Sequence, residues 1–161
     1  MKILFIAMIL AGFNLHGTAM AQDVDSWRGI VPYKSTRYDV EKVLGTCSDD
    51  EGLKDRCLYK LQDENLIVSY AVGQPCSETN KRNLPENTVL RIDINLTKGV
   101  TSLKNSNFEL SKFSVEEDTE IPGHVAYRKI GGGLVLAVFR GSLQNIYYSA
   151  TDTDVKKAAC Q

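Results

Sequence analysis

The residues of this chain best suited to nucleophilic or metal chemistry are four cysteines, Cys47, Cys57, Cys76 and Cys160, and the histidine His124. No two cysteines have the close spacing of a reactive Cys-x-x-Cys pair or of a zinc knuckle. An even number of cysteines instead favours disulfides, and four cysteines allow three pairings. We favour Cys47–Cys57, which closes a short polar loop, and Cys76–Cys160, which ties the penultimate residue to the middle of the chain.

The other groups that could do chemistry are isolated from one another in the sequence. His124 has no neighbouring serine or free thiol, so we interpret it as a surface residue. The acidic groups at 49–51 and 152–154 lack the regular oxygen ligands and glycine turn of a calcium loop. The glycines at 131–133 lie between two predicted strands, where a hairpin turn is expected rather than a phosphate-binding loop. We therefore predict no catalytic residue, no metal site and no cofactor.

The first 21 residues have the pattern of a cleaved signal peptide. Lys2 precedes an apolar run at 3–15, and small residues stand at Ala19 and Ala21 before the expected cleavage point. The run is only 13 residues long, whereas a membrane-spanning helix needs about 20. We therefore expect a secreted or periplasmic protein with no transmembrane segment, in which 22–161 form a single domain. The even cysteine count fits an oxidising compartment.

The balance of charged residues does not fit a protein that binds nucleic acid. Without Lys2, 18 basic residues face 20 acidic ones, and a protein that binds nucleic acid carries a clear basic excess. We therefore exclude nucleic acid and expect a protein or envelope component instead.

A short helix is predicted near the start of the expected domain. Thr36 and Asp39 have the spacing of a capping box, and Gly45 stands where a helix commonly ends. Apolar residues of this segment fall at helical spacing, at Val40, Val43 and Leu44. A last helical turn is expected at 154–159.

The rest of the chain has the period of strands. Val89 to Leu96 alternates apolar and polar residues, as expected of a strand with one buried face. Between the second and third strands, 73–87 is predicted to be a long exposed loop, and the acidic stretch 116–120 is predicted to be solvated. The expected strands are 57–61, 66–72, 89–96, 125–130, 134–140 and 143–149. The sequence thus predicts an α+β fold, with one N-terminal helix packed on a mostly antiparallel sheet of five to six strands and two disulfides.

Aromatic residues are the candidates for a binding surface. Trp27 and Tyr33 stand before the predicted helix, and Tyr147 and Tyr148 lie in the last predicted strand. Neighbours on a strand point to opposite faces, so one of the two adjacent tyrosines is expected to face outward. Exposed tryptophan and tyrosine would favour a protein or glycan contact, but core packing is the interpretation that we favour for these residues.

The opening of the expected domain resembles small exported bacterial proteins of uncharacterised activity. The shared pattern is Trp27-Arg28-Gly29-Ile30-Val31-Pro32 followed by Ser35-Thr36-Arg37-x-Asp39-Val40-Glu41, with Pro75-Cys76, the Asn83 to Leu90 strand entry and the terminal Cys160 further on. The segment from Ser35 to Gly45 is similar to a helix of the small outer-membrane assembly lipoproteins and of the β-lactamase inhibitor protein. This resemblance implies helices packed on one face of an antiparallel sheet.

Three hypotheses for function follow. The first is a non-enzymatic exported domain that binds a protein or envelope component through an exposed sheet face or the 73–87 loop. The second is a small secreted hydrolase or ligand-binding enzyme that uses scattered acids such as Asp93 and Glu64. The third is an inhibitor of a secreted enzyme.

Overall fold

The computed structural model describes residues 26–47, 53–97 and 101–161. The predicted signal peptide and the acidic group at 49–51 lie outside these residues. In the part described, no helix is long and apolar enough to cross a membrane.

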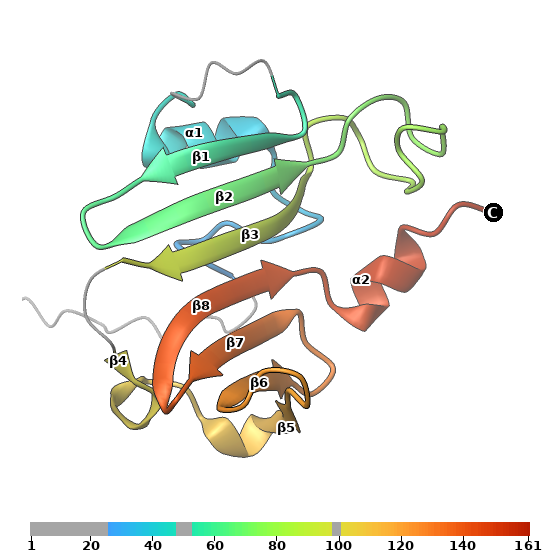
Figure 1. Cartoon of the computed structure of the whole chain (residues 1–161). Helices are drawn as coiled ribbons and strands as arrows, with labels where there is room; N and C mark the ends of the chain where they lie inside the picture. The colour runs from blue at the N-terminus through green and yellow to red at the C-terminus, as the bar shows by residue number, and fades with distance from the viewer. Residues whose placement is uncertain (1–25, 48–52, 98–100) are drawn as a thin grey trace, which may run out of the picture.

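Seven strands form one antiparallel sheet in the order β1-β2-β3-β8-β7-β6-β5, and the two-residue β4 pairs with β8 beside this path (Figure 1). Two α-helices and two 3₁₀ turns complete the described part of the chain. The elements are α1 (Arg37–Leu44), β1 (Arg56–Lys60), β2 (Glu64–Tyr70), β3 (Val89–Leu96), β4 (Thr101–Ser102), η1 (Leu103–Asn105), η2 (Leu110–Lys112), β5 (Phe113–Glu117), β6 (His124–Lys129), β7 (Leu134–Phe139), β8 (Ser142–Ser149) and α2 (Asp152–Lys157).

The expectation of one helix on five to six strands is wrong. The sequence signal missed β5, because this edge strand buries only Phe113 and exposes its next four residues, which include Glu116 and Glu117 of the predicted solvated stretch. It also missed β4, which is too short to show a period. The expected last turn is a second capped helix, α2, which begins at Asp152 after the N-cap Thr151.

The predicted capping box of α1 is present. The backbone N–H of Thr36 donates to the carboxylate of Asp39 at 2.8 Å, and the backbone N–H of Asp39 donates back to the Thr36 hydroxyl at 3.4 Å. These bonds hold the pKa of the Asp39 carboxyl below its usual value, with the backbone bond as the main cause. Along the helix, Val40 is fully buried whereas Val43 is 46% exposed, so the face that packs is narrower than predicted.

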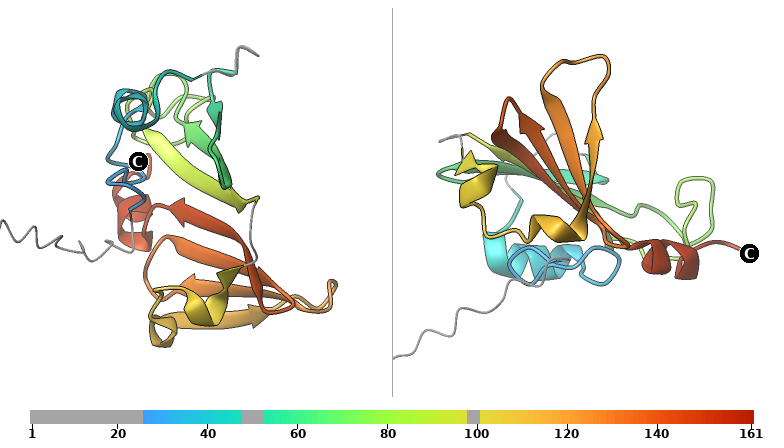
Figure 2. Two further views of the ribbon diagram at one scale, coloured as in Figure 1. Left: turned by 90° about the vertical axis from the view of Figure 1, so that its left-hand side faces the viewer. Right: turned by 90° about the horizontal axis from the view of Figure 1, so that it is seen from below.

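The core lies on one side of the sheet. α1 and the segment that precedes it pack there together with η1 and η2, and both views in Figure 2 show α1 and this segment gathered on the same side. Trp27 and Ile30 close a tight turn against this side of the sheet. The strands supply most of the core through alternate residues, which are Cys57, Tyr59, Leu66, Val68, Tyr70, Val89, Ile92, Ile94, Leu134, Leu136, Val138, Leu143 and Tyr148.

Three of the core residues are tyrosines, and this makes the fold sensitive to alkaline pH. Tyr59, Tyr70 and Tyr148 are 5%, 2% and 2% exposed. Burial raises the pKa of each phenol, to about 12 for Tyr148, because the phenolate would lose its hydration. A raised folded-state pKa contributes stability that is complete below the unfolded pKa of about 10 and is lost as the pH rises through the folded value.

We predict that the free energy of unfolding falls as the pH rises above about 10, because the unfolded chain then ionises these tyrosines more readily than the folded chain does. Phenolate absorbance and far-ultraviolet circular dichroism, followed over the same pH range, measure this. The three buried tyrosines should ionise only as the sheet unfolds. Ionisation of Tyr59, Tyr70 and Tyr148 while the dichroism is unchanged would contradict the prediction.

Candidate functional site

Two of the four aromatic residues predicted at a binding surface lie in the core. Trp27 is 5% exposed, and the Arg28 guanidinium lies over its ring at 4.5 Å from the centroid. Tyr148 is 2% exposed because it pairs with Ile92 and Leu134 on the core side of the sheet. Neither side chain is available to a partner, so for both residues the structure agrees with core packing, the favoured interpretation.

The other two predicted residues are partly exposed and lie at different places. Tyr147 points to the side of the sheet opposite the core, next to Tyr148 in β8, as the alternation of a strand requires. Tyr33 lies outside the sheet, near the 73–87 loop, with the Arg82 guanidinium 6.0 Å from its ring centroid. The structure therefore separates the four predicted residues into two core positions and two distinct surfaces.

Strand register builds the surface around Tyr147. On the side away from the core, paired residues of neighbouring strands form continuous rows of side chains across all seven strands. We call the two central rows on this side the open face. Figure 1 looks onto this side, with α1 behind β1. The first row is Leu58, Ile67, Asp93, Tyr147, Val135, Arg128 and Ser114, and the second is Lys60, Asn65, Asn95, Asn145, Ala137, Ala126 and Glu116.

Each row has its own chemistry. In the first, aliphatic side chains flank the Asp93–Tyr147 pair on both sides, and Ile67 is 40% exposed. In the second, three asparagines on adjacent strands face the same side, and Asn95 Nδ2 donates to Asn145 Oδ1 at 2.9 Å. The face thus combines apolar area with amide donors and acceptors.

The charged groups at the centre of the open face are paired within it. Arg91 forms an ion pair with Asp93, and its guanidinium lies over the ring of Tyr147 at 4.7 Å from the centroid. Arg128 Nε is 2.7 Å from the Glu116 carboxylate. Because these charges compensate one another, they leave little net charge at the centre of the open face. The stacked Arg91 also holds the ring of Tyr147 in place.

The acids of the hydrolase hypothesis do not meet. Asp93 lies on the open face. Glu64 lies on the core side of the sheet, two residues before Leu66 in β2, and its carboxylate is 2.8 Å from the Arg28 guanidinium. The sheet therefore separates the two carboxylates, and a two-carboxylate mechanism would need both of them at one substrate.

His124 lies near one carboxylate at the tip of the β5–β6 hairpin. Its Nδ1 is 3.5 Å from Asp118, whose carboxylate accepts the backbone N–H groups of Glu120 and Ile121. Those backbone bonds are the main reason that the pKa of Asp118 is lowered. Asp118 therefore serves to close the turn. Among the described residues, no group of three or more histidine, cysteine or acidic side chains could hold a metal ion.

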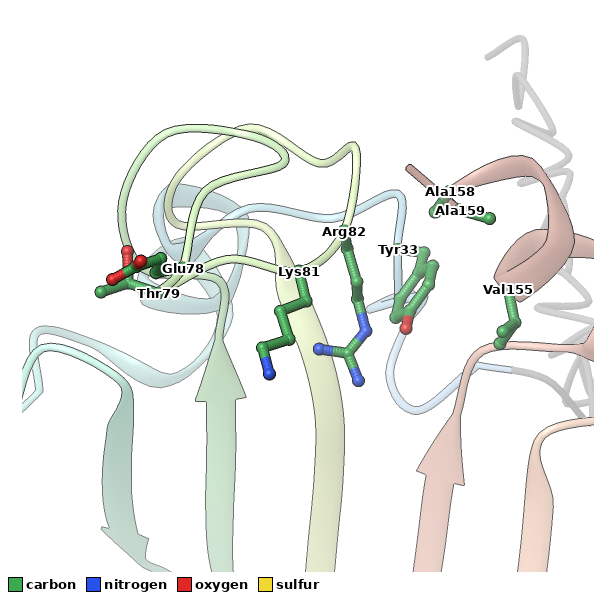
Figure 3. A pocket seen from close by; sticks show the side chains of 8 residues that line it. All are labelled: Tyr33, Glu78, Thr79, Lys81, Arg82, Val155, Ala158 and Ala159. Atoms are coloured by element: carbon green, nitrogen blue, oxygen red, sulfur yellow. The ribbon is translucent and has the colours of Figure 1, made fainter. Parts of the chain in front are cut away.

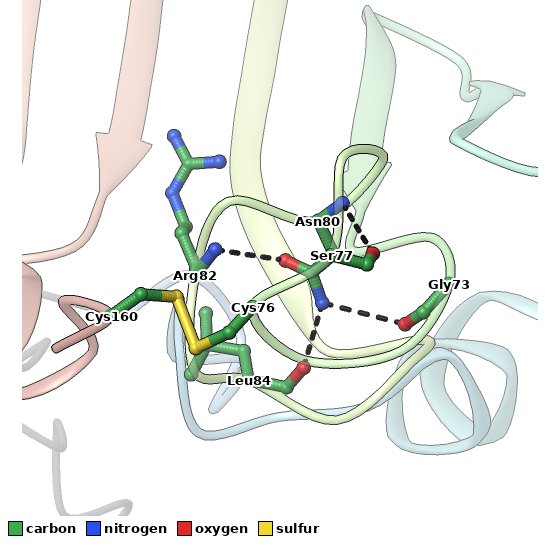
Figure 4. Close-up of a disulfide and its surroundings, with 7 residues drawn as sticks. All are labelled: Gly73, Cys76, Ser77, Asn80, Arg82, Leu84 and Cys160. Carbon is green, nitrogen blue, oxygen red and sulfur yellow. Dashed lines mark hydrogen bonds between the residues drawn. A yellow bond between two sulfur atoms is a disulfide. The ribbon is translucent and has the colours of Figure 1, made fainter.

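Both favoured disulfides are present. Cys47–Cys57 joins the segment after α1 to β1, and Cys76–Cys160 joins residues that are 84 positions apart, with their Cα atoms 5.6 Å from each other (Figure 4). The second bond holds the 73–87 loop against the chain end that follows α2.

Internal hydrogen bonds order the 73–87 loop, which the sequence predicted only as long and exposed. Asn80 is 3% exposed, and its Nδ2 donates to the carbonyl oxygen of Leu84 at 2.8 Å while its Oδ1 accepts from the backbone N–H of Arg82 (Figure 4). Its backbone N–H donates to the Ser77 hydroxyl at 3.1 Å. A buried, bonded amide of this kind fixes the loop backbone. Sequence reasoning missed this role, because an asparagine in a polar loop carries no periodic signal.

Comparisons with known proteins found no match. No protein-family model, no curated protein and no solved structure matches the chain. The resemblance drawn from the opening motif therefore stays a prediction.

We predict that replacing Cys76 and Cys160 together by serine lowers the free energy of unfolding by roughly 2–4 kcal/mol, because the bond closes a long loop in the unfolded chain. Hydrogen exchange followed by mass spectrometry should show faster exchange at 73–87 and in α2, with the central strands little changed. The matched control replaces Cys47 and Cys57, which should affect the segment around β1 and leave 73–87 protected. Unchanged exchange at 73–87 in the first variant would contradict this assignment.

Proposed function

We propose that the chain is an exported, non-enzymatic binding domain that holds a protein partner of the cell envelope or its surroundings against the open face. The observation that carries the proposal is the pair of residue rows across seven strands, with Tyr147 at the centre of one row. Partly exposed Leu58, Ile67 and Val135 lie in the same row.

The make-up of this face is that of a protein interface. Such interfaces combine an apolar centre with hydrogen-bonding groups, and tyrosine and arginine are enriched among their strongest contacts. The Arg91 guanidinium already lies over the Tyr147 ring, 4.7 Å from its centroid. Little side-chain freedom is therefore lost when a partner binds. The Asn95–Asn145 pair offers further donors and acceptors at the side of the apolar row. If the partner is a secreted enzyme, the domain would act as its inhibitor.

Export is part of the proposal. The signal-peptide pattern of residues 1–21 supports it, and so do the two disulfides, which persist in oxidising compartments. We expect the processed protein to begin at Gln22, and its intact mass should be about four hydrogens below that of the reduced chain. Intact-mass measurement before and after reduction tests both points. A product that retains Met1 or alkylates without reduction would contradict the proposal.

A matched pair of substitutions tests the open face. Ile67 is 40% exposed on this face, and Val43 is 46% exposed on α1, on the opposite side of the sheet. We predict that Ile67→Glu lowers partner retention at least about tenfold, because a carboxylate would lose hydration within the contact. Val43→Glu should retain the partner like the unaltered protein.

The measurement is retention of envelope and culture-fluid proteins on the immobilised, oxidised domain, quantified by mass spectrometry for the three proteins side by side. Equal retention by both variants of every protein held by the unaltered domain would contradict the use of the open face. Loss of a polysaccharide in place of a protein with Ile67→Glu would contradict the assigned class of partner.

A further inference from the structure

A pocket separate from the open face lies between the 73–87 loop and α2. Its cavity volume is about 490 Å³, which is within the range of small-molecule sites. Figure 3 shows the side chains around it, which come from the loop, from the segment before α1 and from the region of α2. The lining residues that give the pocket its charge and its apolar surface are Tyr33, Lys81, Arg82, Val155, Ala158 and Ala159.

Two cations on one side of the pocket, Lys81 and Arg82, are not paired with any anion among the described residues. The side chains of Lys81 and Arg82 extend side by side, and Tyr33 lies on the other side of Arg82 (Figure 3). No carboxylate of the described residues forms an ion pair with either cation. Glu78 also lines the pocket, but Figure 3 shows it beside Thr79, apart from the charged ends of Lys81 and Arg82. Adjacent like charges repel, so an anion between them would be stabilised by both.

The opposite side of the pocket is apolar. Val155, Ala158 and Ala159 come from the region of α2, and Val155 is 49% exposed. Small side chains at two of these positions leave room for an apolar group, and the ring of Tyr33 provides an aromatic surface beside it. The pocket therefore fits a ligand that is anionic at one end and apolar at the other.

Both walls are fixed before any ligand binds. The Cys76–Cys160 disulfide joins them, and the backbone N–H of Asn83 donates to the Ala158 carbonyl oxygen at 2.8 Å. Arg82 and Ala159, which both line the pocket, form an isolated β-bridge. A pocket joined by covalent and backbone bonds loses little freedom on binding, which favours even a small ligand.

We propose that this pocket binds a carboxylate that carries an adjoining aromatic or aliphatic group, with Lys81 and Arg82 on the carboxylate and the α2 residues against the apolar part. A free carboxylic acid and the C-terminus of a peptide both present this chemistry. The site is distinct from the open face, so it can fail or hold independently of the proposed function.

Two ligand pairs test the proposal by isothermal titration calorimetry on the purified oxidised protein. The probes are 3-phenylpropionate against 3-phenylpropanamide, and N-acetyl-alanyl-phenylalanine against its C-terminal amide. We expect at least one carboxylate to bind at least about tenfold more tightly than its amide. Binding of the first carboxylate alone identifies a free acid as the ligand, and preferential binding of the second identifies a peptide C-terminus.

Substitutions then place the site. Lys81 and Arg82 are both exposed, so the double change Lys81→Gln and Arg82→Gln should leave the circular dichroism unchanged and weaken carboxylate binding at least about tenfold. The matched control is Lys104→Gln, which removes an exposed cation in η1, outside both the pocket lining and the open face. Failure of both carboxylates to bind at up to about 10 mM, or equal weakening by the control, would overturn the proposal.

Discussion

The constraint on which the rest of the structure depends is that seven strands bury their apolar side chains on a single side of one sheet. Each strand points alternate residues to opposite sides, so a register that places Leu66, Ile92 and Leu136 in the core also fixes which residues face away from it. α1 and residues 26–36 cover the apolar side, together with η1 and η2. The open face is therefore a direct consequence of how the core forms, and Tyr147 faces outward because Tyr148 is buried.

The C-terminal segment from α2 onward is joined to the rest of the fold by bonds that the sheet itself does not supply. α2 has no buried residue within its own length, so hydrophobic packing of the helix contributes little to its position. Cys76–Cys160 and the bond from Asn83 to Ala158 hold its end against the 73–87 loop instead. The disulfide, this hydrogen bond and the Arg82–Ala159 bridge bring Arg82 near the region of α2, where both segments line the pocket. The molecule thus has two surfaces of different origin, one set by strand register and one by these bonds between distant segments.

Much of the local structure could be predicted from the sequence, because helix caps and strand alternation depend on residues that are close together in the chain. The Thr36–Asp39 capping box, the alternation at 89–96 and both cysteine pairings agree with the structure. The strand count could not be predicted, because β5 is an edge strand that buries one residue and so lacks alternation. Residue type alone could not show that Trp27 is buried while Tyr147 faces outward. The sequence did not indicate a pocket at Lys81 and Arg82, because they line it together with Tyr33, which comes from a distant segment of the chain.

The central claim is that one side of the sheet is covered and the other is open to solvent in the whole chain. Methyl relaxation by a soluble paramagnetic agent, measured by nuclear magnetic resonance, tests this directly. The account predicts strong relaxation of the Ile67 and Val135 methyl groups and weak relaxation of those of Leu66 and Leu136, which are fully buried on the core side. Equal protection of all four residues would show that another part of the chain covers the open face, and this would contradict the account.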